Sequence, residues 1–271
     1  MNVLFITWDG PQVSYLESLF LPIFTSIMAE GEFRFHILQF SWAENDVTSR
    51  RRQICEESGC SYTSVNVIRN PVALGSVITS LMGLRHIRKA IKQHNIDLVL
   101  PRSTLPALSP LIALRGNNKK LVFDADGLPL DERVDFAGQS PSNLVHRVLR
   151  DIEAQAVRRA DVVLTRSHKA ISVLQARAGA GTSMAKFHVV SNGRDKSLFD
   201  PGDIADRLGV KQKLGIAADA PLIVYAGSLG PQYCPESMLS LFELIRQSRP
   251  DSHFLVLTGS PEVMIDLASG S

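Results

Sequence analysis

The chain has 271 residues, of which 45% are hydrophobic and 21% are charged, and this composition is that of an ordinary globular protein. The length allows about two domains of roughly 100–200 residues each. The formal net charge of +2 is too small to indicate a nucleic-acid-binding protein, and we interpret the local clusters of Arg and Lys as solvated helix faces.

Cysteine usage and the N-terminus indicate a cytoplasmic protein. The three cysteines, Cys55, Cys60 and Cys234, form no C-x-x-C pair, which argues against a disulfide framework or a zinc site and fits a reducing compartment. The first residues lack the basic region of a signal peptide. No apolar run approaches the ~18 residues that a transmembrane helix needs. We expect no metal site.

Short apolar runs alternate with helical patterns over residues 1–190. The expected strands are 3–7, 33–40, 62–67, 96–100, 120–123, 161–165 and 187–190. The expected helices are 15–28, 46–58, 72–94, 107–114, 143–159 and 167–177. This alternation predicts an α/β fold with a Rossmann-like, doubly wound, mostly parallel sheet.

The pattern pauses after Asn192-Gly193, a dipeptide suited to a turn because both residues tolerate positive φ. It restarts after a charged helix around 207–214, with a strand at 222–226, a helix at 236–248 and a strand at 252–257. Two strands cannot cover the core of a second Rossmann-like domain. The expected organisation is therefore a first domain (1–190), a linker (191–220) and the truncated start of a second domain (221–271).

Candidate site residues follow the predicted strands, because ligands of open α/β sheets gather outside the carboxyl ends of the strands. The first such loop contains Gly10, Pro11 and Gln12. It lacks the G-x-G-x-x-G pattern of dinucleotide-binding proteins. We expect the neighbouring Trp8 and Tyr15 to combine core packing with lining of the cleft.

Charged residues follow two later strands. Arg102 comes after strand 96–100, and an acidic loop with Asp124, Asp126 and Arg133 comes after strand 120–123. The two carboxylates could orient a hydroxyl group, act as a base or stabilise positive charge. Alternatively, Asp124 bonds backbone amides in a tight turn while Asp126 is solvated. The arginines could meet an anionic ligand or pair with nearby carboxylates.

A glycine-bearing turn follows strand 222–226. It reads Gly227-Ser228-Leu229-Gly230 and precedes the helix at 236–248. A strand, a glycine turn and a helix N-terminus form an anion site, because free backbone N–H groups and the helix dipole point the same way. The alternative is that these glycines only turn the chain.

Residues 187–231 resemble the domain junction of the GT-B-fold glycosyltransferases of group 1. The residues that match are Val190, Asn192-Gly193, Asp195, Phe199, Pro201 and Ala226-Gly227. Other segments resemble a bacterial branch of these retaining enzymes: Arg102-Ser103, Asp124-x-x-Gly127, Asp131-Glu132-Arg133, Ala160-Asp161 through Ser167, and 227–230 with Tyr233.

The resemblance implies two Rossmann-like domains, the N-terminal one for an acceptor and the C-terminal one for a nucleotide-diphospho-sugar donor, with no other cofactor. It implies a role in cell-surface polysaccharide synthesis on a glycan or lipid-linked acceptor, with peripheral contact to the inner membrane. The residues that it implicates are Asp124 and Asp126 in catalysis, Gly227, Ser228, Gly230 and Tyr233 in donor binding, and Arg102 and Arg133 in acceptor binding. The topology of the sheet adds Gly10, Pro11 and Gln12 to the expected acceptor-binding residues.

Three departures from the family pattern bear on activity. Ser228 and Tyr233-Cys234 stand where much of the family has an Arg and a Lys that reach the donor diphosphate, and Asp126 stands where the branch often has Arg. The family's Glu-x7-Glu motif for the donor sugar would lie beyond Ser271. We therefore expect an inactive fragment of a transferase. A sugar-nucleotide epimerase of the same fold and a non-catalytic binding fragment are the alternatives.

Overall fold

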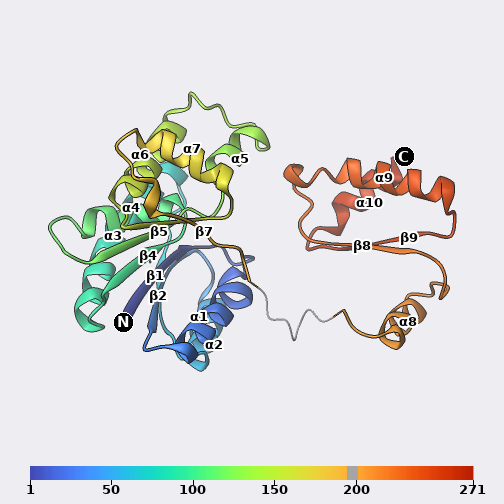
Figure 1. Cartoon of the computed structure of the whole chain (residues 1–271), viewed down its shortest axis with the longest axis horizontal. Helices are drawn as coiled ribbons and strands as arrows, with labels where there is room; N and C mark the ends of the chain where they lie inside the picture. Colours follow the sequence, from blue (N-terminus) through green and yellow to red (C-terminus); the bar gives the residue numbers. More distant parts are fainter. Residues whose placement is uncertain (194–200, 271) are drawn as a thin grey trace. The chain divides into compact units, whose positions relative to one another are not determined.

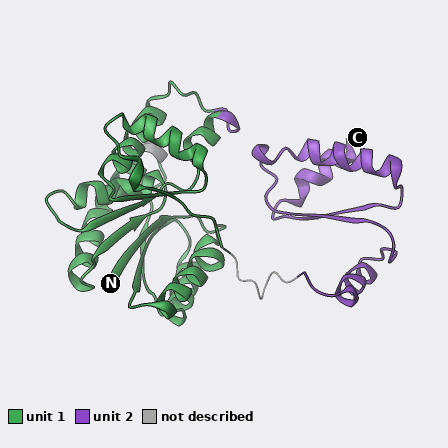
Figure 2. Ribbon diagram, viewed as in Figure 1, with its two compact units in different colours: residues 1–134, 139–195 green, residues 135–138, 196–271 purple. Residues whose placement is uncertain are grey.

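The computed structural model describes residues 1–193 and 201–270, except for the side chains of residues 72 and 73. The chain divides into two compact units: unit 1 (residues 1–134 and 139–195) and unit 2 (residues 135–138 and 196–271) (Figure 2). Asp195 and Phe199 of the junction motif, and residues 194–200 of the expected linker, lie outside the described residues.

Unit 1 contains a parallel sheet with the strand order β3-β2-β1-β4-β5-β6-β7. The strands are β1 (Asn2–Trp8), β2 (Arg34–Ser41), β3 (Ser61–Asn66), β4 (Leu98–Pro101), β5 (Lys120–Asp124), β6 (Val162–Thr165) and β7 (Phe187–Val189). The strands expected to share one parallel sheet do so, which confirms the predicted Rossmann-like fold. The order reverses beside β1, between β1 and β4, where such sheets place their ligands.

Alternate side chains of each strand fill two separate cores, one on each face of the sheet. Val3 and Phe5 of β1 pack with the helices of one face, and Leu4 and Ile6 pack with those of the other. The first face holds η1 (Leu16–Phe20), α1 (Leu21–Glu30) and α2 (Asn45–Glu57). The second face holds α3 (Val72–Gln93), α4 (Thr104–Ala113), α6 (Leu144–Arg159) and α7 (His168–Ala178) (Figure 1).

The helices of unit 1 differ from the sequence prediction in three places. The expected helix 15–28 is divided into η1 and α1. The helix α4 begins at Thr104, three residues earlier than expected. The acidic loop contains a short helix, α5 (Pro129–Asp135). Proline suits the first turn of a helix because no N–H is needed there, and Asp131 and Glu132 in that turn favour the positive end of the helix dipole. The remaining short helix of this unit is η2 (Met184–Lys186).

Unit 2 contains a parallel pair of strands, β8 (Leu222–Ala226) and β9 (His253–Leu257). Its helices are α8 (Ile204–Lys213), η3 (Pro231–Tyr233), α9 (Pro235–Ser248) and α10 (Pro261–Ser269). The start of α8 is fixed by a capping box between Asp203 and Asp206. Apolar side chains of both strands, such as Val224 and Leu257, remain exposed, as the sequence predicted.

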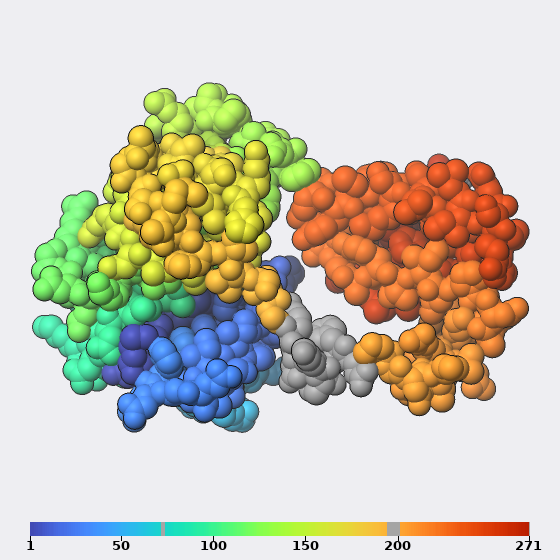
Figure 3. Space-filling model, viewed as in Figure 1, coloured from blue at the N-terminus to red at the C-terminus, as the bar shows by residue number. Residues whose placement is uncertain are grey.

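The space-filling view shows the side chains of α6 and α7 as a continuous yellow surface over part of unit 1 (Figure 3). Among the helices that the structure describes, none has both the length and the apolar character needed to cross a membrane.

Candidate active site

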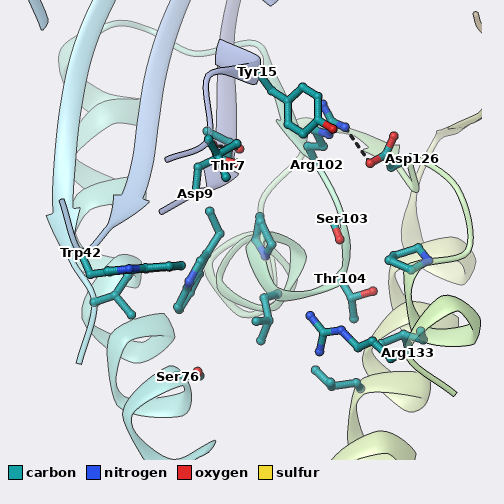
Figure 4. Close-up of a pocket in the computed structure, with 18 of the residues that line it drawn as sticks. Thr7, Asp9, Tyr15, Trp42, Ser76, Arg102, Ser103, Thr104, Asp126 and Arg133 are labelled. Atoms are coloured by element: carbon teal, nitrogen blue, oxygen red, sulfur yellow. Dashed lines mark hydrogen bonds and ion pairs between the residues drawn. The ribbon is translucent and has the colours of Figure 1, made fainter. Parts of the chain in front are cut away.

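A cavity of about 430 Å³, called the edge cavity below, opens at the carboxyl edge of the unit 1 sheet (Figure 4). The segments that follow β1 to β5 all contribute to it, and its size is that of a small-molecule site. Its polar and charged lining residues are Thr7, Asp9, Tyr15, Arg69, Ser76, Arg102, Ser103, Thr104, Asp126 and Arg133. The topology of the sheet thus gathers hydroxyl, carboxylate and guanidinium groups around one space.

The loop after β1 packs beside the edge cavity, and Gly10 itself does not line that cavity. Gly10 is buried, and a Cβ atom there would lie 2.6 Å from Cζ2 of Trp42, so no side chain fits. Arg51 Nη2 donates to the backbone oxygens of Gly10 and Pro11, at 3.3 and 3.4 Å. Pro11 and Gln12 are exposed and are not among the residues that line the edge cavity. The loop contributes mainly by placing the side chains beside it, among them Trp42.

Arg102 and Asp126 form an ion pair across two loops of the edge cavity, with 2.6 Å between Nη2 and Oδ2 (Figure 4). The guanidinium carbon of Arg102 also lies 5.3 Å from the ring centre of Tyr15 and 4.5 Å from that of Phe20. These contacts restrict the position of Arg102, and its positive charge is already paired with the carboxylate of Asp126. Its main role in this arrangement is to orient Asp126.

Asp124 lies behind this pair and does not line the edge cavity. Its Oδ1 accepts the backbone N–H of Asp126 at 3.0 Å, and its Oδ2 lies 3.0 Å from Nη2 of Arg166. Burial raises the pKa of Asp124, although Arg166 acts in the opposite direction. In the structure, Asp124 accepts a hydrogen bond from a backbone amide, which is one of the two alternatives that the sequence left open.

Asp126 is held from three sides. Besides Arg102 and the backbone bond to Asp124, its Oδ1 lies 3.5 Å from Nε of Arg166. Its backbone has φ of 62°, a left-handed conformation that few residues other than glycine adopt, and Ser103 beside it has φ of 70°. Strained backbone of this kind concentrates at functional sites. Asp126 is therefore an ion-paired carboxylate at the cavity wall, not simply a solvated one.

Arg133 reaches the edge cavity from α5. Asp131 anchors that helix, because its Oδ1 lies 2.7 Å from Nη2 of Arg150 on α6 and 2.6 Å from Nη2 of Arg177 on α7. Arg133 lies near Thr104 at the cavity (Figure 4). Within residues 1–193 and 201–270, no carboxylate lies within ion-pair distance of Arg133.

A further cation lines the edge cavity. The guanidinium carbon of Arg69, after β3, lies 4.8 Å from the ring centre of Trp42, and Arg69 has no carboxylate partner in the described part of the chain. Asp9, the second lining carboxylate, accepts hydrogen bonds from Thr7 and Gln39 at 2.6 and 3.0 Å. Guanidinium groups therefore outnumber carboxylates in the lining, which favours a ligand with negative charge.

The glycine turn of unit 2 is only partly available to a ligand. The N–H of Gly227 donates to the carbonyl of Leu257 at 3.0 Å, and the Ser228 carbonyl accepts from the Tyr225 hydroxyl at 2.6 Å. The helix η3, which ends at Tyr233, separates Gly230 from α9. Ser228 and Tyr233 are exposed and bring no positive charge to the turn.

Sequence reasoning missed two arginines, Arg166 and Arg69. Both follow strands of the sheet, and this position was the available signal. In contrast, Trp8 and Tyr15 line the edge cavity as expected. In the residues that the structure describes, no three His, Cys, Asp or Glu side chains gather as a metal site would require.

Comparisons with known proteins agree with this fold. A D-inositol 3-phosphate glycosyltransferase of Jonesia denitrificans is 34% identical over 79 residues, which is 28% of this chain and 19% of that protein. The structure of sucrose-phosphate synthase from Thermosynechococcus elongatus has a TM-score of 0.67 at 14% identity, covering 94% of this chain and 61% of that one. The structure of Anabaena HepE with UDP and glucose has a TM-score of 0.63 at 15% identity, covering 99% and 65%.

At such low identities the two structures show a shared fold and no more. The chain spans less than two-thirds of the length of each of these proteins. A sequence profile, described as Glycosyltransferase Family 4, matches residues 44–198, which is more than half of the chain. The resemblance to GT-B-fold glycosyltransferases of group 1 is thereby confirmed, and the chain belongs to Glycosyltransferase Family 4.

Proposed function

We propose that this chain serves the acceptor side of a glycosyl transfer, in which a sugar moves from a nucleotide-diphospho-sugar to a glycan or lipid-linked acceptor of cell-surface polysaccharide synthesis. The protein would work in the cytoplasm, at the inner face of the membrane. The observation that carries the proposal is the edge cavity, where guanidinium groups outnumber carboxylates at the carboxyl edge of the sheet. Two of the similar proteins support it, since one is a glycosyltransferase and the other was solved in complex with UDP and glucose.

In such a transfer, the bond between the anomeric carbon and the diphosphate oxygen breaks and the diphosphate leaves with the bonding electrons. A bond to the oxygen of an acceptor hydroxyl forms as that hydroxyl gives its proton to a carboxylate. We propose that Asp126, one of the two carboxylates that line the edge cavity, accepts the hydrogen bond and then the proton of that hydroxyl. Asp124 lies behind it, so we assign Asp124 the role of positioning Asp126. Arg166, which touches both carboxylates, shares this role.

We expect this chain to bind the nucleotide-sugar donor more weakly than the acceptor. The diphosphate leaving group needs positive charge or free N–H groups. The turn at 227–230 offers the exposed residue Ser228 and a Gly227 amide that is already bonded. We therefore propose that Gly230 and Tyr233 form the surface for the nucleotide, and that donor affinity and turnover in this chain are low.

Acceptor binding can be tested by intrinsic fluorescence. Trp8 and Trp42 are the two tryptophans of the chain, and both line the edge cavity. The experiment titrates neutral hexoses, uronic acids and hexose phosphates. We expect a fluorescence change with the anionic sugars, and we expect Arg133→Gln to weaken their binding about tenfold or more, since a charge-assisted hydrogen bond contributes ~1.5–3 kcal/mol.

The matched control is Arg115→Gln, which removes an exposed arginine that does not line the edge cavity. Equal affinities of the two variants, or no response to any sugar class, would contradict the proposal. Transfer itself is measured as acceptor-dependent release of UDP, GDP or ADP. Asp126→Asn should lower any such release, and an unchanged rate would remove Asp126 from the reaction.

A further inference from the structure

A second cavity of about 560 Å³ lies among the helices α3, α4 and α6 on the second face of the unit 1 sheet and is mostly apolar. Leu105 and Leu108 of α4 belong to its lining, together with residues of α3 and α6. The full lining, called the apolar groove below, is Leu74, Ser76, Val77, Leu105, Leu108, Arg133, Gln139, Leu144, Val145, Val148, Leu149 and Ile152.

Several of these apolar side chains face solvent. Leu144 is 72% exposed, Leu74 56% and Val148 49%. Contiguous exposed apolar surface on a folded domain marks a place where another molecule binds. The groove has the volume of a site for one small molecule.

The apolar groove adjoins the edge cavity. Ser76, Leu105, Arg133 and Leu149 line both. A single ligand can therefore lie partly in the polar space and partly in the apolar one. The exposed guanidinium of Arg133 lies at this junction and has no carboxylate partner within the described residues.

We propose that the apolar groove binds the hydrocarbon chain of an amphiphilic acceptor, whose phosphate or diphosphate group meets Arg133 and whose sugar enters the edge cavity. The inference rests on the proposed function and selects the lipid-linked acceptor from the two classes named there. Charge and polarity carry the choice. Hydroxyl and guanidinium groups line one end, a single cation marks the junction, and aliphatic side chains line the other end.

The test uses two probes that differ only in chain length, butyl phosphate and dodecyl phosphate, each as a monomer below its micelle concentration. Binding is followed by the fluorescence of Trp8 and Trp42. The wild-type chain should bind dodecyl phosphate at least about tenfold more tightly, because each buried methylene adds to the affinity. Val148→Glu should reduce this preference to less than about threefold.

Three further variants make the result specific. Met184→Glu changes a side chain that is 51% exposed and lies outside the apolar groove, and it should leave the chain-length preference unchanged. Arg133→Gln should weaken both phosphates by a similar factor and keep their ratio. Val145→Gln provides a milder change within the groove if Val148→Glu unfolds the protein, as circular dichroism would show.

Equal affinity for the two probes, or a preference that survives both groove variants, would overturn the inference. So would a Val148→Glu chain that loses binding to anionic phospholipid vesicles but keeps its preference for monomeric dodecyl phosphate, because the groove would then dock the membrane. These results are separate from the proposed transfer. A chain-length preference without any response to the anionic sugars would leave the groove in place and count against the proposed function, whereas binding of anionic sugars without a chain-length preference would do the reverse.

Discussion

The ion pair between Arg102 and Asp126, with 2.6 Å between Nη2 and Oδ2, joins the loops after the neighbouring strands β4 and β5. The register of these strands covers only two pairs of residues, Leu98 with Lys120 and Val99 with Leu121. An isolated bridge between Arg102 and Asp124 continues the connection at the carboxyl edge. The backbone bridge and the ion pair thus connect β4 and β5 beyond their short stretch of paired residues.

The first prediction concerns the charge of Asp126. Asp126→Asn leaves Arg102 and Arg166 without their shared carboxylate, and Asn tolerates the left-handed backbone, so the change tests charge alone. We expect the free energy of unfolding to fall by about 1–3 kcal/mol, measured by urea denaturation. Asp151→Asn, in an exposed pair with Arg158, should cost no more than about 1 kcal/mol. Equal losses would show that the Asp126 pairs contribute no more stability than an exposed ion pair.

The second prediction concerns the loop after β1. Gly10→Ala places a methyl group 2.6 Å from the Trp42 indole, which must move. We expect a loss of about 1–3 kcal/mol in unfolding free energy and a shift in tryptophan emission. Gly181→Ala, where no atom lies within 4 Å of the new Cβ, serves as the control. An unchanged emission spectrum in Gly10→Ala would mean that Trp42 does not pack on this loop.

The third prediction is a pH dependence of stability. Burial raises the pKa of Glu153 to about 7, against the attraction of Arg150 and with added repulsion from Asp131. Between its ordinary pKa of 4.5 and about 7, the folded chain then keeps a proton that the unfolded chain has released. The unfolding free energy should therefore fall as the pH rises through this window and level off above it, by no more than about 3 kcal/mol in all.

This dependence is measured by urea unfolding at about pH 5, 6, 7 and 8. Glu153→Gln cannot ionise, so it should lack the Glu153 component of the slope. The difference between the two proteins isolates that component from the other titrating groups. Parallel curves for wild type and variant would show that Glu153 is not the group responsible.

The fourth prediction concerns the donor loop. Ser228→Arg adds a cation to an exposed turn that has none, and a charge-assisted contact with phosphate contributes ~1.5–3 kcal/mol. We expect UDP to bind about tenfold more tightly, measured by calorimetry. Ser248→Arg adds the same charge at the far end of α9 and should have little effect. Equal gains would indicate unspecific attraction rather than a site at Ser228.

Much of the fold could be read from the sequence, because strands and helices leave local patterns. The apolar run at 222–226 coincides with β8, and the run at 3–7 lies within β1. Their alternation with helices predicted a parallel sheet, and parallel strands bring their carboxyl ends to one edge. That reasoning was sufficient to select Arg102 and Arg133, which the structure places at one cavity.

Which charges meet was decided only by the tertiary structure. Asp124 lies 42 residues from Arg166 and Asp126 lies 24 from Arg102, so no local period relates them. Burial likewise depends on packing: Asp124 and Asp126 are two residues apart, yet only Asp126 lines the edge cavity. Local patterns determine where strands begin and end, whereas ion pairs, cavities and the groove between α3 and α6 arise from side chains that folding alone brings together.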